Sequence, residues 1–201
     1  MTELQALPDE ALMDRFRSGK DGAQAAFRLL TRRYSEKVFN FILRQIRHPE
    51  TAADLVQEVF LRVVKNAASF RSESRFSTWI FTIARNLCVD AQRRAKHRYT
   101  VALDAPLRHG ETDGATMLDM VKDDRPIADS RLHDKRFSGA LEEALGALPD
   151  EQREVFLMRE LHGLKFREIA DIVGVPENTV KSRMRYALEG LRLRLGAFGE
   201  T

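Results

Sequence analysis

The sequence predicts an all-α protein made of two small helical domains that are joined by a flexible acidic linker. Apolar residues recur at spacings of three and four along most of the chain, which is typical of helices with one buried face. No alternating apolar run is bounded by hairpin turns, as strands would require. The helical pattern also weakens between the two ends of the chain. We therefore expect domains at 1–97 and 136–201, with the linker at 98–135.

The first domain is predicted to contain helices at 9–17, 25–46, 52–65 and 78–95. The pattern is clearest in the third of these, where Asp54 and Glu58 lie opposite an apolar stripe. The stripe consists of Leu55, Val56, Val59, Phe60, Val63 and Val64. Thr51, three residues before Asp54, predicts a capping pair at the start of this helix.

The linker is predicted from composition. Residues 103–129 contain two prolines, two glycines and little periodicity, and their seven acidic and three basic residues leave a net charge of −4. Such a segment has too few apolar residues to fold alone.

Bulk composition excludes several classes of protein. The chain has 201 residues, of which 43% are hydrophobic, and a formal net charge of +3. Its one cysteine, Cys88, has no partner for an internal disulfide, and no Cys/His cluster has the spacing of a metal site. The N-terminus does not resemble a signal peptide, and no apolar run approaches the roughly 18 residues that span a membrane. We expect a cytoplasmic protein with no membrane insertion, no metal and no cofactor.

The second domain contains a helix-turn-helix pattern. Pro149, with the acids that follow it, predicts the start of one helix, FREIADIVG at 166–174 predicts a second, and Gly174 is suited to end it. Pro176 then fits the start of a third helix, which has one apolar side and one polar side. A helix that lies in the DNA major groove needs such a polar side. A merely solvated charged face is the alternative, and the acids Glu177 and Glu189 favour it.

A basic and aromatic segment ends the first domain. FRSESRFSTW at 70–79 mixes rings with arginines and hydroxyls, and 85–98 adds five basic residues to one acid. Cations that hold a backbone beside rings that receive unstacked bases are what single-stranded nucleic acid requires. Alternatively, Phe76 and Trp79 are core anchors, and 93–98 is a basic helix end.

Three motifs, in order, resemble the ECF (extracytoplasmic function) group of bacterial RNA polymerase sigma factors. They are DLVQEVFLRV at 54–63, FRSESRFSTWIFTIARNLCVDAQRR at 70–94 and LPDEQREVFLMRELHGLKFREIADIVGVPENTVKSRMRYALEGLR at 148–192. The resemblance covers nearly the whole chain. It implies that the two domains are sigma regions 2 and 4, and that the protein has no catalytic activity of its own.

The resemblance also implies partners and binding residues. Core RNA polymerase would bind the polar face of the 54–63 helix, at Asp54, Gln57, Glu58 and Arg62. Single-stranded −10 promoter DNA would bind Phe70, Arg71, Ser72, Ser74, Arg75, Phe76, Ser77, Trp79, Arg85, Asn86, Asp90 and Arg93. Duplex −35 DNA would bind Thr179, Lys181, Ser182, Arg183, Arg185 and Tyr186. The acidic linker would enter the polymerase cleft, and an anti-sigma factor, which in some relatives tethers the protein to the membrane, is a further implied partner.

Two other functions compete with this hypothesis. A stand-alone helix-turn-helix regulator would bind duplex DNA without polymerase, but it gives no role to DLVQEVF or to the aromatic and basic segment. A nuclease would need carboxylates held in metal-ligand geometry, which the acids of 104–129 lack. The absence of a Walker-type glycine loop fits promoter melting by capture of unpaired bases, without nucleotide hydrolysis.

Overall fold

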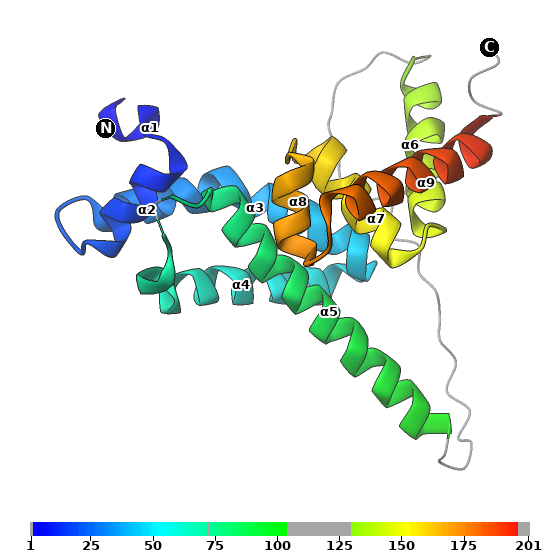
Figure 1. The fold of residues 1–201 in the computed structure, drawn as a ribbon, viewed down its shortest axis with the longest axis horizontal. Helices are drawn as coiled ribbons and strands as arrows, with labels where there is room; N and C mark the ends of the chain where they lie inside the picture. Colours follow the sequence, from blue (N-terminus) through cyan, green and yellow to red (C-terminus); the bar gives the residue numbers. More distant parts are fainter. Residues whose placement is uncertain (1, 72, 104–129, 197–201) are drawn as a thin grey trace.

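The computed structural model describes residues 2–71, 73–103 and 130–196, and every regular element within these ranges is helical (Figure 1). The elements are α1 Thr2–Ala6, α2 Asp9–Arg17, α3 Ala23–Ile46, α4 Pro49–Lys65, η1 Ala67–Ser69, α5 Phe76–Leu103, α6 Ser130–Gly146, α7 Asp150–Phe156, η2 Leu157–Leu161, α8 Phe166–Val173 and α9 Glu177–Leu195. The all-α prediction is confirmed. We call α1–α5 the N-terminal bundle and α6–α9 the C-terminal bundle.

The N-terminal bundle packs α2, α3, α4 and α5 around an apolar core. Each of these helices contributes buried side chains, for example Leu12, Leu30, Val59 and Ile80. At one end of the core, the Asp9 carboxylate accepts hydrogen bonds from Arg33 at 2.6 Å and from the Tyr34 hydroxyl at 2.5 Å. Burial, followed by the hydrogen bond to Asp9, raises the pKa of Tyr34 well above its usual range. Helices α2 and α3 are thereby fixed to one another by polar as well as apolar contacts.

Helix α4 begins earlier than the sequence suggested. Its first residue is Pro49, and the His48 ring nitrogen Nδ1 accepts a hydrogen bond from the backbone N–H of Thr51 at 3.3 Å. The predicted Thr51–Asp54 capping pair is therefore wrong. Proline suits the first helical turn because the N–H that it lacks has no partner there, and the imidazole takes the place of a hydroxyl as the cap.

The C-terminal bundle contains the predicted helix-turn-helix in α8 and α9. Gly174 ends α8 in the left-handed conformation, with φ of 71°, which a residue without a side chain adopts without strain. The Lys165 backbone N–H donates to the Glu168 carboxylate at 2.7 Å and closes the first turn of α8. Gly190 of α9 passes so near Leu148 that an added Cβ would lie 2.8 Å from the Leu148 Cδ2. A small residue at this position lets α9 pack closely on the turn between α6 and α7.

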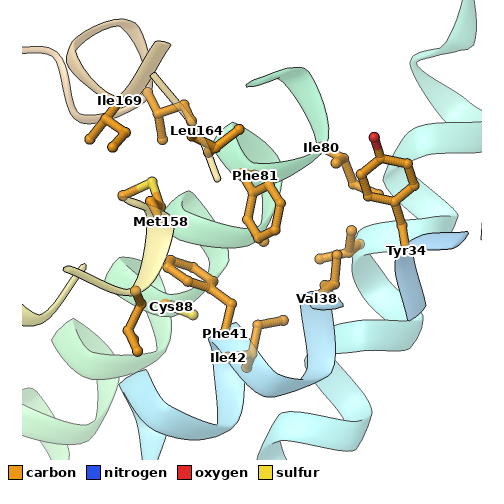
Figure 2. Close-up of a cluster of buried hydrophobic side chains, with 14 of the residues drawn as sticks. Tyr34, Val38, Phe41, Ile42, Ile80, Phe81, Cys88, Met158, Leu164 and Ile169 are labelled. Atoms are coloured by element: carbon orange, nitrogen blue, oxygen red, sulfur yellow. The ribbon is translucent and has the colours of Figure 1, made fainter. Parts of the chain in front are cut away.

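The two bundles pack directly against each other. Helices α6 and α7 contact α3, and α8 contacts α5, so that the C-terminal bundle covers the middle of the N-terminal bundle (Figure 1). Figure 2 shows Met158 and Leu164 beside Phe41, Phe81 and Cys88, so that apolar side chains of the two bundles lie next to one another. The chain thus has one continuous buried cluster that draws on both predicted domains.

The helices extend into the segment that composition assigned to the linker. Helix α5 continues to Leu103, and α6 begins at Ser130. The end of α5 projects away from both bundles (Figure 1). Most of the acidic stretch, residues 104–129, lies outside the described residues.

Candidate polymerase and nucleic-acid interfaces

The polar face of α4 lies on the surface of the N-terminal bundle. Asp54 and Gln57 are exposed, while Glu58 and Arg62 are half-buried and form an ion pair at 2.9 Å, one helical turn apart. All four residues expected to bind polymerase therefore lie on one accessible helix face.

The same face carries apolar side chains that the sequence argument did not single out as ligands. Leu61 is 52% exposed, and Val64, which the periodicity assigned to the buried stripe, is 44% exposed. Leu61 lies four residues after Gln57, and residues four apart share one face of a helix. The sequence therefore contained the signal that Leu61 belongs to this surface. Exposed apolar groups beside charged ones are typical of a surface that binds another protein.

The aromatic residues before and within α5 form a cluster inside the N-terminal bundle. Phe70 is 1% exposed and Phe76 is 0% exposed, and their ring centroids lie 6.0 Å apart. Trp79 is half-buried, with its ring 5.3 Å from that of Phe70, while Phe76 also meets Tyr34 at 5.1 Å. In this conformation neither phenylalanine ring can stack on a base. This conformation places Phe70 and Phe76 in the core, whereas the sequence analysis expected them to contact DNA. Phe76 packs on Tyr34 of α3, and Phe70 packs on Phe76 and Trp79 of α5.

The polar residues of the same segment lie nearer the surface. Arg71, Ser74 and Arg75 are exposed, and Ser77 is half-buried. Ser72, expected in the same set, lies outside the described residues. The start of α5 is held by a hydrogen bond from the Phe76 backbone N–H to Glu10 of α2 at 3.1 Å. That bond fixes the segment to the body of the bundle.

Two of the expected DNA-binding arginines form ion pairs with the C-terminal bundle. Arg85 Nε lies 2.8 Å from Glu154 Oε2, with a second contact from Nη2 to Oε1 at 3.3 Å. Arg75 Nε lies 3.3 Å from Glu168 Oε1. The pairing of Arg85 with Glu154 through two contacts is the strongest geometry for an arginine and a carboxylate.

Further along α5 the expected residues are accessible. Asn86 and Arg93 are exposed and Asp90 is half-buried, with Arg93 paired to Asp90 at 3.3 Å. This surface pair joins two residues one helical turn apart, so it contributes little to stability. Arg93 therefore remains available to a ligand.

Helix α9 presents the outward face that periodicity predicted. Lys181, Ser182, Arg185 and Tyr186 are exposed. The Arg185 guanidinium lies 4.9 Å from the centre of the Tyr186 ring, so the two side chains form one surface unit. The remaining two expected residues, Thr179 and Arg183, are half-buried. Arg183 points toward α7, where it pairs with Glu151 at 2.6 Å.

The structure also brings together charged residues that sequence reasoning missed. Arg153 and Glu154 on α7 are buried. Arg153 donates to Gln45 of α3 at 3.3 Å and to the Leu148 carbonyl at 3.3 Å, and it also pairs with Asp150. No sequence signal distinguished these two residues from the other charges of α7, because packing against helices distant in sequence buries them.

Within the described part of the chain, no group of His, Cys, Asp and Glu is arranged to hold a metal ion. In the same ranges, none of the helices combines the length and the apolar character needed to cross a bilayer.

Comparison with known proteins gives matches to both bundles. The family described as "Sigma-70 region 2" matches residues 30–98, and "Sigma-70, region 4" matches residues 138–191. The ECF RNA polymerase sigma factor SigW of Bacillus subtilis (strain 168) is 32% identical over 181 residues, which cover 90% of this chain and 95% of that relative. The ECF RNA polymerase sigma-E factor of Escherichia coli (strain K12) is 31% identical over 191 residues, covering 93% and 94%.

Two solved structures share the fold. CnrH in complex with the cytosolic domain of CnrY matches with a TM-score of 0.65 and 22% identity, covering 94% of this chain and 97% of that one. The sigma factor RpoE in complex with the anti-sigma factor NepR, from Bartonella quintana, matches with a TM-score of 0.64 and 22% identity, covering 85% and 96%.

Proposed function

Since this chain belongs to the ECF RNA polymerase sigma factors, which bind RNA polymerase and direct it to promoters, we propose a role for each of its exposed faces. Helix α4 binds the core enzyme, the start and middle of α5 bind −10 DNA as a single strand, and α9 reads −35 DNA as a duplex. The sequence prediction of the family is confirmed, and members of this family are not enzymes.

The polymerase contact is assigned to Asp54, Gln57, Glu58 and Arg62, with Leu61 added. Support comes from the surface position of this face and from its mixture of charge and exposed apolar area. The charges supply orientation and the leucine supplies apolar contact area.

The −10 contact is assigned to the described members of the expected set that are not core residues, which are Arg71, Ser74, Arg75, Ser77, Trp79, Arg85, Asn86, Asp90 and Arg93. Arginine and hydroxyl groups suit phosphates, and the half-buried Trp79 ring suits an unstacked base. Phe70 and Phe76 act indirectly, since they pack behind Trp79 and fix its ring. Ser72 remains in the proposed set on sequence grounds alone.

The −35 contact is assigned to Lys181, Ser182, Arg185 and Tyr186 at base edges, with Thr179 and Arg183 near phosphates. Support comes from α9 being the second helix of a helix-turn-helix whose outward face carries these side chains. An arginine that is ordered by stacking on a tyrosine loses less entropy when it pairs with guanine.

We infer two further features of the setting in which the protein acts. A partner of the anti-sigma class binds this chain, by analogy with structural neighbours that are bound to anti-sigma factors or to a cytosolic partner domain. The chain acts in the cytoplasm, where RNA polymerase and promoters are. Its functional units are residues 1–97 and 136–201, and the acidic segment 98–135 joins them within the polymerase.

The polymerase assignment is tested by reversing charge on α4. Asp54→Lys combined with Glu58→Lys should abolish co-purification with bacterial core RNA polymerase, because both acids lie on the proposed contact face. The matched control reverses two exposed acids elsewhere on the N-terminal bundle, Asp21→Lys with Glu36→Lys, and should bind as the unaltered protein does.

Transcription completes this test. Run-off transcription from genomic fragments should give discrete start sites with the unaltered protein and with the control, and none with the α4 variant. If a folded α4 variant still binds core polymerase, the assignment of α4 is wrong. If the unaltered protein shifts duplex DNA but never binds core polymerase, a stand-alone regulator replaces this proposal.

A further inference from the structure

The segment that joins η1 to α5, residues 70–76, carries part of the surface that we assign to −10 DNA. The side chains of Phe70 and Phe76 at its two ends are buried. Arg71, Ser74 and Arg75 lie between them and are exposed. The direction in which these exposed side chains point therefore depends on how the backbone is held at the two ends of the segment.

Helix α2 binds the backbone at the first end of this segment. The Arg17 Nη1 atom donates to the Phe70 carbonyl at 2.8 Å, and the Arg17 Nη2 atom donates to the Asp14 carboxylate at 3.0 Å. Asp14 lies one helical turn before Arg17, so it orients the guanidinium group. A hydrogen bond from a charged donor is stronger than one between neutral groups. Residue 70 is therefore held by Arg17 at its carbonyl as well as by the core at its ring.

The same helix binds the second end. Glu10 Oε1 accepts a hydrogen bond from the Phe76 backbone N–H at 3.1 Å. Phe76 is the first residue of α5, and the first N–H groups of a helix have no partner within that helix. A carboxylate at this position also interacts favourably with the positive end of the helix dipole. Glu10 thus acts as a cap supplied by another helix, and it fixes the place at which α5 begins.

Helix α2 is itself firmly attached to the N-terminal bundle. The Phe16 ring stacks on that of Phe27 of α3, with 4.6 Å between the centroids, and Asp9 binds Arg33 and Tyr34 of α3. Arg17 and Glu10 therefore connect the segment to a helix that is fixed on the body of the bundle. Helix α2 ends before residue 30, where the match to Sigma-70 region 2 begins.

We propose that α2 is a positioning element for −10 recognition, in which Arg17 and Glu10 hold the two ends of residues 70–76 in the conformation that binds unpaired bases. The proposal rests on the assignment of this segment to −10 DNA. Neither Arg17 nor Glu10 has to touch DNA for this role. Their hydrogen bonds restrict the segment before DNA arrives, so less conformational entropy is lost on binding. Affinity for the −10 element therefore depends on a helix outside the surface that contacts DNA.

The charges of the two residues allow this role to be separated from a direct electrostatic effect. Glu10 is an acid near a surface that binds phosphates, so its removal should strengthen DNA binding if only its charge matters. Its removal should weaken binding if its hydrogen bond to Phe76 positions the segment. The Arg17 side chain is 39% exposed, so a phosphate contact is the competing role for it. The salt dependence of binding reports such a contact.

The experiment uses holoenzyme reconstituted from the full-length protein and bacterial core RNA polymerase. Fluorescence anisotropy measures binding of a labelled single strand that carries the non-template −10 element of a promoter found by run-off transcription. Glu10→Ala and Arg17→Ala should each weaken binding about tenfold, equivalent to about 1.4 kcal/mol, with the same salt dependence as the unaltered protein. Glu10→Gln should bind within about twofold of the unaltered protein, because an amide oxygen still accepts the Phe76 N–H.

The matched control is Arg15→Ala. Arg15 lies on the same helix, and its Nε also donates to a backbone carbonyl, that of Asp21 at 3.2 Å, but this carbonyl belongs to the turn between α2 and α3. The control should leave single-strand binding unchanged. Every variant should keep its affinity for core polymerase and for the −35 duplex, and circular dichroism checks that each is folded. Hydrogen exchange at the Phe76 amide should be faster in Glu10→Ala than in Glu10→Gln or the unaltered protein.

Each outcome decides a separate point. Weaker single-strand binding by Arg71→Ala, with unchanged binding by Glu10→Ala and Arg17→Ala, would overturn the positioning role. Tighter binding by Glu10→Ala would also overturn it, because the acid would then act through its charge alone. A salt slope that falls by about 0.7 in Arg17→Ala would make Arg17 a phosphate contact instead. If the unaltered protein does not bind core polymerase, the proposed function fails, and the exchange rate at Phe76 still shows whether Glu10 holds the start of α5.

Discussion

Helix α9 and the first half of α5 are both assigned to DNA, yet the fold treats their side chains differently. In the described part of the chain, the cations Lys181 and Arg185 of α9 pair with acids of their own helix, Glu177 at 2.7 Å and Glu189 at 3.9 Å. On and before α5, Arg75 and Arg85 pair with acids of the other bundle, and the nearby phenylalanines are buried. Contacts within one helix are weak and easily exchanged for phosphate, whereas the pair of Arg85 with the buried Glu154 is held in place by the packing of both bundles.

The comparison shows that identical residue types need not be equally available. An arginine on the outward face of a helix is available as soon as the helix forms. An arginine that is half-buried at an interface, such as Arg85, is less available because an acid of the other bundle holds it. Single-residue changes can separate these cases, and the following predictions run from the largest expected effect to the smallest.

Phe76→Ala tests whether the aromatic side chains before α5 are core or ligand. We expect it to lower the free energy of unfolding by about 3–5 kcal/mol, because it empties a fully buried site that contacts Tyr34 and Phe70. Urea denaturation followed by circular dichroism measures the loss. The control Arg71→Ala, at an exposed position, should change stability by less than about 0.5 kcal/mol. Unchanged stability with loss of single-strand binding would make Phe76 a base contact after all.

Acid should weaken the contact between the bundles through His162. Burial, and then the nearby charges of Lys37 and Arg44, lower its pKa from 6.5 to about 4. Between these two values the separated or unfolded state takes up a proton that the packed state does not, so stability falls as the pH drops from about 6.5 to about 4. This loss of stability is at most about 3 kcal/mol, because each unit of pKa shift corresponds to about 1.36 kcal/mol.

His162→Phe isolates this contribution. The phenylalanine ring should pack between Phe41 and Phe81. Urea denaturation at several pH values should show that the free energy of unfolding falls less between pH about 6.5 and about 4 in the variant than in the unaltered protein. The raised pKa of Glu154 acts in the opposite sense, since the packed state binds that proton more readily, and it is common to both proteins. If the free energy of unfolding falls with acid by the same amount in the variant and in the unaltered protein, His162 does not titrate at this interface.

Arg185→Ala and Arg183→Ala compare an outward with an inward cation on the same helix. Loss of Arg185 should weaken binding to a −35 duplex, taken from promoters found by run-off transcription, by about 1–3 kcal/mol, and less on a scrambled duplex. Loss of Arg183, which is held by Glu151, should cost less than about 1 kcal/mol, equally on both sequences. Anisotropy titrations measure both. Equal losses from Arg185→Ala on both duplexes would make that residue a phosphate contact.

Much of this protein follows from its sequence. Periodicity predicted α2, α3 and α4 to within a few residues, although α5 continues eight residues beyond its predicted end at 95. Gly174 and the following proline predicted the helix-turn-helix, and Lys181, Ser182, Arg185 and Tyr186 of α9 lie on the surface as expected. These features are local. A helix forms from neighbouring residues, and its two faces are set by a period of 3.6 residues, so a short stretch of sequence contains the necessary information.

Only the tertiary structure decided which faces meet. The pattern could not show that Phe70 and Phe76 turn inward, that Arg153 and Glu154 are buried, or that Arg85 is held by an acid 69 positions away. Periodicity states which residues share a face, but whether that face is covered depends on segments distant in sequence. The physical reason is that burial and ion pairing arise from the packing of whole helices, so the sequence determined the surfaces of this sigma factor and the packing determined which of them are open.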